Sequence, residues 1–247
     1  MANPFRTSNP ALSEKAFQGQ IATGQAMTLQ GTVNKTGVLL FCAVATAAWT
    51  WGISHSPNPE NAFPWMMGGL VGGLITALIT IFKKTWAPIT APLYALLEGL
   101  VLGGISAIFE KSYPGVAVQA IGLTFGTLFV LLLAYKTGLV RATQGFKVGV
   151  IAATGGIAVF YLVEMGLSFF HVQVPAINGS GPWGIAFSLF VVVIAALNLV
   201  LDFDMIETGV RMGAPKYMEW YGAFGLMVTL IWLYLEMLRL LAKARRR

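Results

Sequence analysis

The sequence is poor in charged residues. Asp, Glu, Lys and Arg make up 11% of the 247 residues, whereas a soluble domain averages about 25%. With so few charges and 56% hydrophobic residues, the chain cannot cover a water-exposed surface with polar groups. We therefore predict a polytopic membrane protein, and the length is typical of one compact domain.

Cysteine and histidine are also scarce. Cys42 is the single cysteine, which excludes an intrachain disulfide and a metal site built on thiolates. His55 and His171 fall in predicted loops; we assign them no role, with pH sensing as the alternative. We predict no cofactor. The first residues, MANPFRTSNPALSEKAFQGQ, have no apolar core, so we expect a polar arm over 1–35 rather than a signal peptide.

Positive charge is distributed in short patches between apolar runs, and the formal net charge is +6. This pattern is typical of orientation in a membrane and argues against nucleic acid as a partner. The positive-inside rule predicts a cytoplasmic N-terminus. The tail over 243–247, KARRR, is expected to contact anionic headgroups. Seven crossings would place this tail outside, so either the last segment re-enters or the earlier helices overrule the tail.

Seven stretches are long and apolar enough to cross a bilayer as helices, which need roughly 20 residues each. No sustained alternation of polar and apolar residues suggests a barrel strand. We therefore predict an all-α membrane protein, with its transmembrane domain over 36–242. The predicted spans are 36–53, 64–82, 89–109, 116–135, 146–170, 183–201 and 221–241.

Small residues recur at helical spacing in several of these spans. Gly-x-x-x-Gly patterns let two helix backbones approach closely in lipid, so we expect tight helix packing at these positions, with a hinge as the alternative. The pairs are Gly68 and Gly69 with Gly72 and Gly73, Gly99 with Gly103, Gly122 with Gly126, and Gly145 with Gly149.

Three glutamates fall inside predicted spans: Glu98, Glu164 and Glu236. A charge near the bilayer centre costs at least about 2.5–3.5 kcal/mol, so such a residue needs a partner, water or a proton. Glu98 is a candidate intramembrane acid, or else a protonated acid bonded to a neighbouring helix. Glu164 lies near the end of its span, where a headgroup-level position is the alternative.

The densest acidic cluster follows the sixth span, in LNLVLDFDMIETGVRMG. If that helix ends near 201–206, Asp202 lies in its last turn, where the helix dipole and partial burial both favour the protonated acid. A second carboxylate nearby would bind a proton or a hard cation such as Ca²⁺ with it. Alternatively, Asp202, Asp204 and Glu207 are wetted by cytoplasm and balanced by Arg211 and Lys216.

At three places the sequence resembles the Bax-inhibitor family of membrane proteins, which includes the transmembrane Bax inhibitor motif proteins. The first, ALLEGLVLGGISAIFEKSYPGVAVQAIGLTFGTLFVLLLAYKTG, is similar to the family's third and fourth helices. The second, LVLDFDMI, resembles the Asp-Thr-Gln-Leu-Ile pattern that ends the family's sixth helix. The third, LIWLYLEMLRLL, resembles the seventh helix and its Leu-Tyr-Leu-Asp motif.

The resemblance implies a seven-helix bundle with the last helix at its centre. It also implies a pH-sensitive Ca²⁺ leak controlled by two interacting acids, and a link in eukaryotic members to suppression of cell death. The two acids fall on Asp202 and Glu236, the candidate proton and tentative Ca²⁺ ligands, while Asp204 adds a third carboxylate at the family's Gln position. The permeant or bound ion would be Ca²⁺ or a proton.

The sequence departs from the family in two respects. Glu236 replaces the aspartate of the seventh helix, and the segment ETGVRMGAPKYMEWYGAFG is longer than is typical. The longer segment indicates a bacterial branch, and hence a multi-pass protein of the bacterial inner membrane.

Three alternatives to a channel have different sequence requirements. An intramembrane aspartyl protease is disfavoured because no Gly-x-Gly-Asp stretch is present, and we predict no enzymatic activity. A non-transporting regulator of a membrane protease or stress response, acting on another membrane protein through helix contacts, is compatible with the glycine patterns. A proton-coupled carrier is disfavoured because no inverted repeat is evident.

Overall fold

The computed structural model describes residues 25–169 and 179–246. Most of the predicted N-terminal arm, His171 and Arg247 lie outside them. Within the described residues, seven helices are long and apolar enough to cross a membrane, which confirms the predicted fold class. They are α1 (Leu29–Ser54), α2 (Ala62–Phe82), α3 (Ala87–Ser112), α4 (Val116–Lys136), α5 (Gln144–Phe169), α7 (Pro182–Arg211) and α8 (Met218–Arg245), with the short 3₁₀ turns η3 (Pro59–Asn61) and η4 (Lys84–Trp86) on either side of α2.

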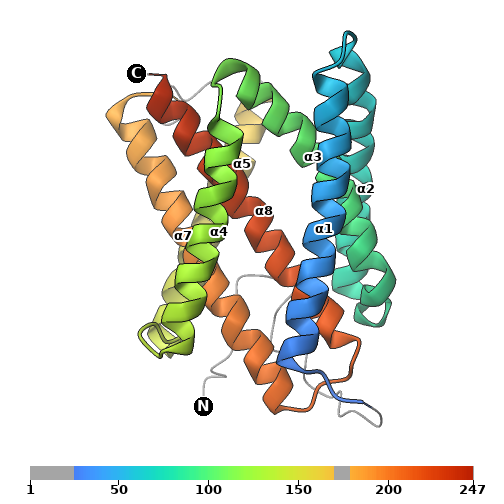
Figure 1. Cartoon of the computed structure of the whole chain (residues 1–247). Helices are drawn as coiled ribbons and strands as arrows, with labels where there is room; N and C mark the ends of the chain where they lie inside the picture. The colour runs from blue at the N-terminus through green and yellow to red at the C-terminus, as the bar shows by residue number, and fades with distance from the viewer. Residues whose placement is uncertain (1–24, 170–178, 247) are drawn as a thin grey trace.

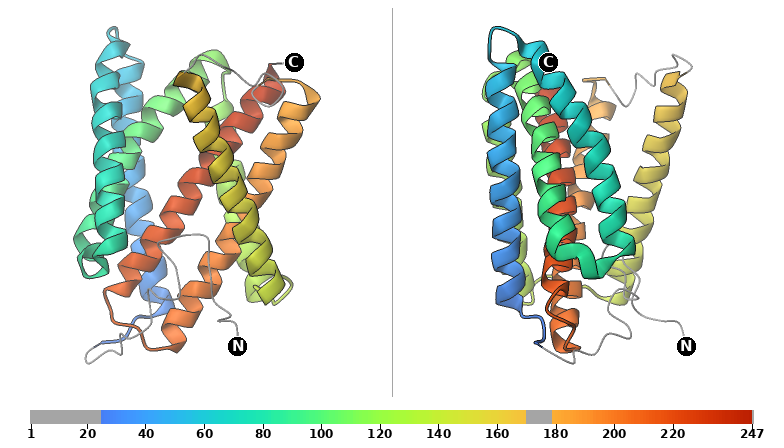
Figure 2. Two further views of the ribbon diagram at one scale, coloured as in Figure 1. Left: turned by 180° about the vertical axis from the view of Figure 1, so that it is seen from behind. Right: turned by 90° about the vertical axis from the view of Figure 1, so that its right-hand side faces the viewer.

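The last helix, α8, occupies the centre of the bundle (Figure 1). It packs against α7, α1, α3 and α4. Its buried residues lie on every side, including Phe224, Leu233 and Leu238, none of which is exposed. By contrast, α5 lies at the edge of the bundle (Figure 2) and packs mainly on α7. The central position expected for the seventh span is therefore confirmed.

Close backbone approach joins α1 to α3, and it depends on glycine. A Cβ at Gly99 would lie 2.2 Å from the Ala43 carbonyl oxygen, and one at Gly103 would lie 2.1 Å from that of Ala47. Real Cβ atoms do not come so near, so α1 and α3 can pack in this way only because both positions are glycine. In contrast, Gly122 has nothing within 4 Å of the position of a Cβ.

Several helices extend beyond the spans that hydropathy indicates. α1 begins at Leu29, so the predicted boundary at residue 35 lies inside it. α7 continues to Arg211 and α8 begins at Met218, so most of the stretch interpreted as a long linker is helix. α8 also continues through Lys243 to Arg245, into the predicted basic tail. These additions contain charged side chains, which ended the apolar runs in the sequence.

The basic connections between helices gather at one end of the bundle. One end of the bundle contains the start of α1 and three connections, namely α2–α3, α4–α5 and α7–α8 (Figure 1). The last turn of α8 lies at the other end. The predicted cytoplasmic basic groups therefore share one end. Because α8 is a full-length crossing helix, re-entry of the last segment is not the explanation for the basic tail.

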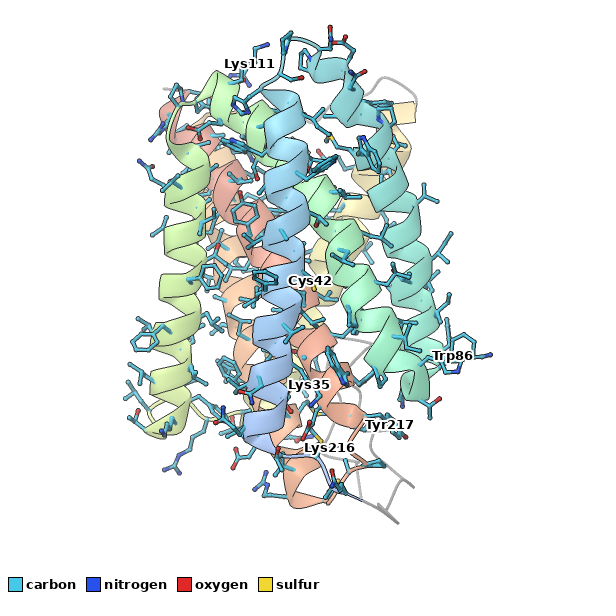
Figure 3. All side chains as sticks on the ribbon, turned by 45° about the vertical axis from the view of Figure 1, so that its right-hand side comes forward. Lys35, Cys42, Trp86, Lys111, Lys216 and Tyr217 are labelled. Carbon is cyan, nitrogen blue, oxygen red and sulfur yellow. The ribbon has the colours of Figure 1, made fainter. Side chains whose placement is uncertain are left out.

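A buried carboxylate joins the α7–α8 connection to the start of α1. The Glu219 side chain on α8 is fully buried and forms ion pairs with Lys35 of α1 and with Lys216, the latter at 3.0 Å. It also accepts hydrogen bonds from the backbone N–H of Thr28 at 2.8 Å and from the Thr28 hydroxyl at 2.9 Å. Figure 3 shows Lys35 and Lys216 on facing elements at this end.

Residues 25–28 run alongside the α7–α8 connection. The Met27 N–H donates to the Ala214 carbonyl at 2.7 Å, and the Lys216 N–H donates to that of Gln25 at 3.0 Å. A Cβ at Gly31 would lie 2.1 Å from Glu219 Oε1, so this position must be glycine for the carboxylate to fit. We call residues 25–28, Lys35, Lys216 and Glu219 the terminal clamp.

The glycine contacts predict opposite outcomes for two matched substitutions. Gly103→Ala places a methyl group against the α1 backbone and should destabilise the protein by about 1–3 kcal/mol. Gly122→Ala faces open space and should leave stability unchanged or raise it by up to about 1 kcal/mol. The melting temperatures of the detergent-purified variants would check this, and equal melting temperatures would contradict the packing.

The terminal clamp predicts that Glu219→Gln destabilises the protein by about 1–3 kcal/mol, because buried donors lose a charged acceptor. Amide hydrogen exchange at Met27 should accelerate at the same time, since the segment it belongs to is attached through this carboxylate. Glu60→Gln is the control, because Glu60 is exposed. Unchanged exchange at Met27 in Glu219→Gln would show that the clamp does not depend on the carboxylate.

Candidate functional site

Besides Glu219 of the terminal clamp, two carboxylates are almost completely buried on the central helix pair. Asp202 on α7 is 1% exposed, and Glu236 on α8 is 2% exposed. Asp202 lies about two and a half turns before the end of α7 at Arg211. The expectation that it occupies the last turn is therefore wrong, and the helix dipole acts only within that turn. Burial inside the bundle, rather than the dipole, defines its environment.

Glu236 belongs to a three-residue cluster with Tyr161 and Arg239. The Tyr161 hydroxyl of α5 donates to Glu236 Oε1 at 2.9 Å. Arg239 donates to both carboxylate oxygens, at 2.9 and 3.2 Å, and to the Tyr161 oxygen at 2.6 Å. The guanidinium carbon also lies 5.1 Å from the centre of the Tyr161 ring. These contacts supply the hydrogen-bonding and basic partners that a buried carboxylate requires at the α5–α8 interface.

One turn beyond Arg239 on α8, the Lys243 side chain points into the bundle. It is 9% exposed and donates to Ser188 Oγ at 2.9 Å and to the Gly184 carbonyl at 3.3 Å, both on α7. Glu164 and Glu236 lie within electrostatic reach of it. Lys243 therefore does not contact headgroups as the tail was expected to, but belongs to a charged cluster shared by α5, α7 and α8.

Two contacts define the register of α8 against the antiparallel α7. At one end Lys243 meets Ser188. At the other, a Cβ at Gly222 would lie 3.2 Å from Ile206 Cγ1. Between these two contacts, 18 residues of α7 run antiparallel to 21 residues of α8.

This register separates Asp202 from Glu236. Interpolation between the two contacts places Asp202 opposite the part of α8 near residue 227. Glu236 is about nine residues farther on, which is roughly 14 Å along the helix axis. The register therefore favours different depths for the two acids, and the direct contact expected from the family resemblance stays a prediction.

The separation bears on ion binding. A Ca²⁺ ion takes six to eight oxygen ligands at 2.3–2.6 Å, so one ion could touch both acids only if their carboxylates came within about 5 Å of each other, and the register favours a larger separation. Within residues 25–169 and 179–246, no group of three or more His, Cys, Asp or Glu side chains could hold a metal ion. Each acid must therefore be considered as a separate position.

The other two members of the acidic cluster diverge from Asp202. Asp204 accepts from Lys147 of α5 at 2.6 Å, in an ion pair whose side chains are mostly buried. Glu207 accepts from the Tyr135 hydroxyl of α4 at 2.5 Å. Asp204 is thus brought together with a lysine rather than with Asp202 or Glu236.

Glu98 lies on another interface. It is half-buried on α3, shares a hydrogen bond with Tyr94, and its Oε1 would be 3.0 Å from a Cβ at Gly73 of α2. Tyr94 packs edge-on against Phe224 of α8 at 4.9 Å. One alternative for Glu98 was a hydrogen bond to a neighbouring helix. The structure instead gives it a hydrogen-bond partner on its own helix, Tyr94, where α3 faces α2.

Sequence reasoning missed the basic and phenolic partners, namely Tyr161, Lys147 and Lys243. One signal was available: Glu236, Arg239 and Lys243 follow at intervals of three and four residues, which places them on one face of a helix. Tyr161 and Lys147 come from α5, and their pairing depends on packing that no local pattern reveals.

The comparisons with known proteins agree with this architecture. A family model described as Bax inhibitor 1 like matches residues 9–246, nearly the whole chain. No curated protein and no solved structure matches the chain. A multi-pass bundle of seven spans, with its last helix central and buried acids on the last two helices, is what the resemblance of the three sequence stretches implied. The chain belongs to the Bax inhibitor 1 like family.

Proposed function

We propose that the protein is a pH-sensitive cation leak, with Ca²⁺ as a permeant ion, whose path follows the interface of α5, α7 and α8. Two acids lie along this path at separate depths, Asp202 and Glu236, and we call them the acidic stations. One observation carries the proposal: two carboxylates, 1% and 2% exposed, lie on the central helices of a membrane bundle. Ionisable groups at such depths are costly and mark ion or proton pathways.

The station at Glu236 is closed by its own neighbours. Arg239 occupies both carboxylate oxygens, so an incoming cation must displace the guanidinium. The Arg239 side chain is 43% exposed, which gives it space to swing outward. Tyr161 then keeps one hydrogen bond to the carboxylate and holds it in place.

Protonation acts on both stations in the same direction. An ionised carboxylate attracts a cation, and a protonated one does not. Flux should therefore fall as the pH falls. With so few ligands the leak would be weak and only modestly selective. No catalytic step is part of the proposal.

The basic end of the bundle supports an orientation. Lys35, Lys83, Lys84 and Lys147 lie with the start of α1 and the connections at that end. The positive-inside rule then predicts that this end, with the terminal clamp, faces the cytoplasm. The membrane would be a bacterial inner membrane.

Single and double substitutions test whether two stations share the pH response. In liposomes with a trapped Ca²⁺ dye, the double variant Asp202→Asn with Glu236→Gln should lose the pH dependence of flux. Each single variant should keep part of it, because two acids roughly 14 Å apart along the axis titrate largely separately.

Glu60→Gln, an exposed carboxylate, is the matched control and should behave as wild type. Empty liposomes define the background. An unchanged pH profile in the double variant would eliminate both acids as the stations. Complete loss in either single variant would instead favour acids that act as one coupled pair.

Arg239→Gln should act in the opposite direction. Removing the cation that competes for Glu236 should raise flux at neutral pH, by up to about fivefold if the half-exposed ion pair contributes up to 1 kcal/mol. Arg141→Gln, in the α4–α5 connection, is the control and should leave flux unchanged. A decrease with Arg239→Gln would show that the guanidinium assists the passage of ions.

A second candidate function is a non-transporting regulator that binds another membrane protein. One observation favours it: Gly122 and Gly126 on α4, and Gly145 and Gly149 on α5, have nothing within 4 Å of the position of a Cβ. These faces would accept a neighbouring helix closely. Purified protein that supports no Ca²⁺ flux at any pH would favour this candidate over the leak.

A further inference from the structure

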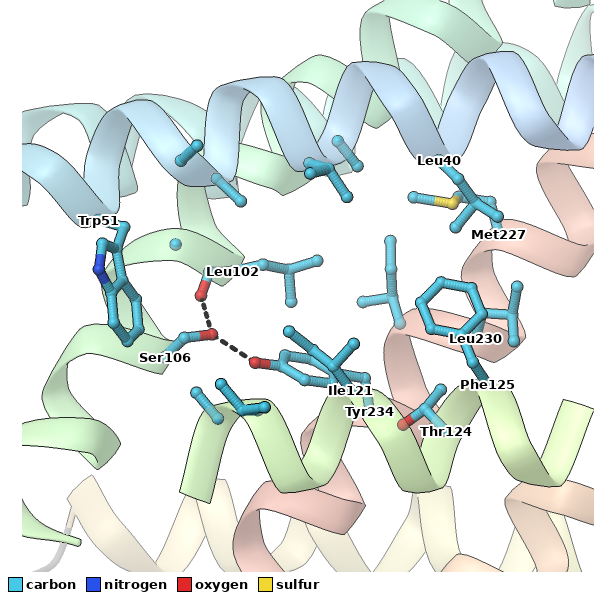
Figure 4. A pocket seen from close by; sticks show the side chains of 18 residues that line it. Leu40, Trp51, Leu102, Ser106, Ile121, Thr124, Phe125, Met227, Leu230 and Tyr234 are labelled. Carbon is cyan, nitrogen blue, oxygen red and sulfur yellow. Dashed lines mark hydrogen bonds between the residues drawn. The ribbon is translucent and has the colours of Figure 1, made fainter. Parts of the chain in front are cut away.

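A second feature of the bundle lies away from the acids. A cavity of about 380 Å³ separates α1 from α4, with α3 and α8 forming its floor. Figure 4 shows its walls, which are almost entirely apolar, from Trp51 at one end to Met227 and Phe125 at the other. We call it the lateral groove.

The lateral groove opens toward the bilayer. Its two sides are α1 and α4, which are not packed closely against each other. Val44 on α1 and Val118 on α4 both line it, and both are largely exposed on the outer surface of the bundle. Because α1 and α4 are crossing helices, this outer surface faces lipid.

The polar groups within the groove are already satisfied. The Ser106 hydroxyl donates to the Leu102 carbonyl at 2.6 Å, and the Tyr234 and Ser106 oxygens are 2.6 Å apart. Since Ser106 uses its proton on Leu102, Tyr234 is the donor in the second bond. An apolar chain would therefore lose nothing by lying against this hydrogen-bonded pair.

A basic side chain, Arg245, lies next to one end of the groove. Arg245 of α8 donates to the carbonyl of Pro114, in the α3–α4 turn, and the first residues of α4, Ala117 and Val118, line that end. Pro114 takes one of the five guanidinium donors. The neighbouring carboxylate, Glu110, accepts from the backbone N–H groups of Gly115 and Ala117 and also interacts electrostatically with Arg245.

Trp51 indicates the depth of this end. It lines the groove and stacks on His55, which caps α1, with ring centres 4.7 Å apart. Tryptophan at the end of a spanning helix is typical of the headgroup level. The groove therefore runs from the headgroup region, where Arg245 lies, into the hydrocarbon.

We propose that the lateral groove holds one acyl chain of an anionic phospholipid, whose phosphate binds Arg245. The apolar walls, the lateral opening and the cation at headgroup level together match that ligand. Lipid binding here is independent of cation flux, because the groove and the two acidic stations share no residue.

The test uses the full chain reconstituted in vesicles of phosphatidylcholine and phosphatidylglycerol, followed by native mass spectrometry of the extracted protein. Wild type should retain one phosphatidylglycerol per chain. Ala48→Phe on α1 and Val118→Phe on α4 narrow the groove and should each reduce that occupancy at least about fivefold, the effect of about 1 kcal/mol.

Each wall variant has a control on the same helix. Ala45→Phe and Val130→Phe change exposed residues that do not line the groove, and both should retain the lipid. Arg245→Gln should lower the preference for phosphatidylglycerol over phosphatidylcholine about fivefold, the usual contribution of one basic residue at an anionic surface. Wild-type occupancy in both wall variants, or no retained lipid in wild type, would overturn the proposal.

Discussion

The burial of α8 is the constraint on which much of the structure depends. A central helix in a membrane bundle reaches neither water nor headgroups along most of its length, yet this one carries Glu219, Glu236, Arg239 and Lys243. Each charge needs a partner from a neighbouring helix or from α8 itself, because an isolated charge in this setting is costly. The partners are what fix the neighbours: α1 through Lys35, α5 through Tyr161, and α7 through Ser188.

Two kinds of contact hold the bundle together: polar contacts between side chains, and close backbone approach at glycine. In lipid, apolar side chains gain little by leaving their surroundings, so packing depends on close approach and interhelical hydrogen bonds. The α1–α3 contact uses close approach at Gly99 and Gly103. The contacts of α8 with α1 and α5 use charge. The peripheral α5 packs mainly on α7 and is positioned in part by the ion pair of Lys147 with Asp204.

The sequence predicted the number and approximate position of the spans, because hydropathy depends on local composition. The central place of the seventh span came from the family resemblance. The ends of the helices were predicted too short for a common reason: an apolar run stops at its first charges, such as Asp202 or Lys216, but a helix continues wherever packing supplies partners. Gly103 was correctly linked to tight packing, whereas the same pattern at Gly122 faces open space. Spacing cannot tell which glycine face meets a neighbour.

The relation between Asp202 and Glu236 could not be predicted from either residue alone. It depends on the register of α7 against α8, in which an offset of about nine residues corresponds to roughly 14 Å along the axis. At an effective dielectric constant of 20, two charges at that distance interact by about 1.2 kcal/mol, compared with about 4 kcal/mol at 4 Å. Repulsion between the acids is therefore too weak to drive the helices apart. In the proposed leak, control of the path comes instead from each acid's own surroundings, and for Glu236 these are Arg239 and Tyr161.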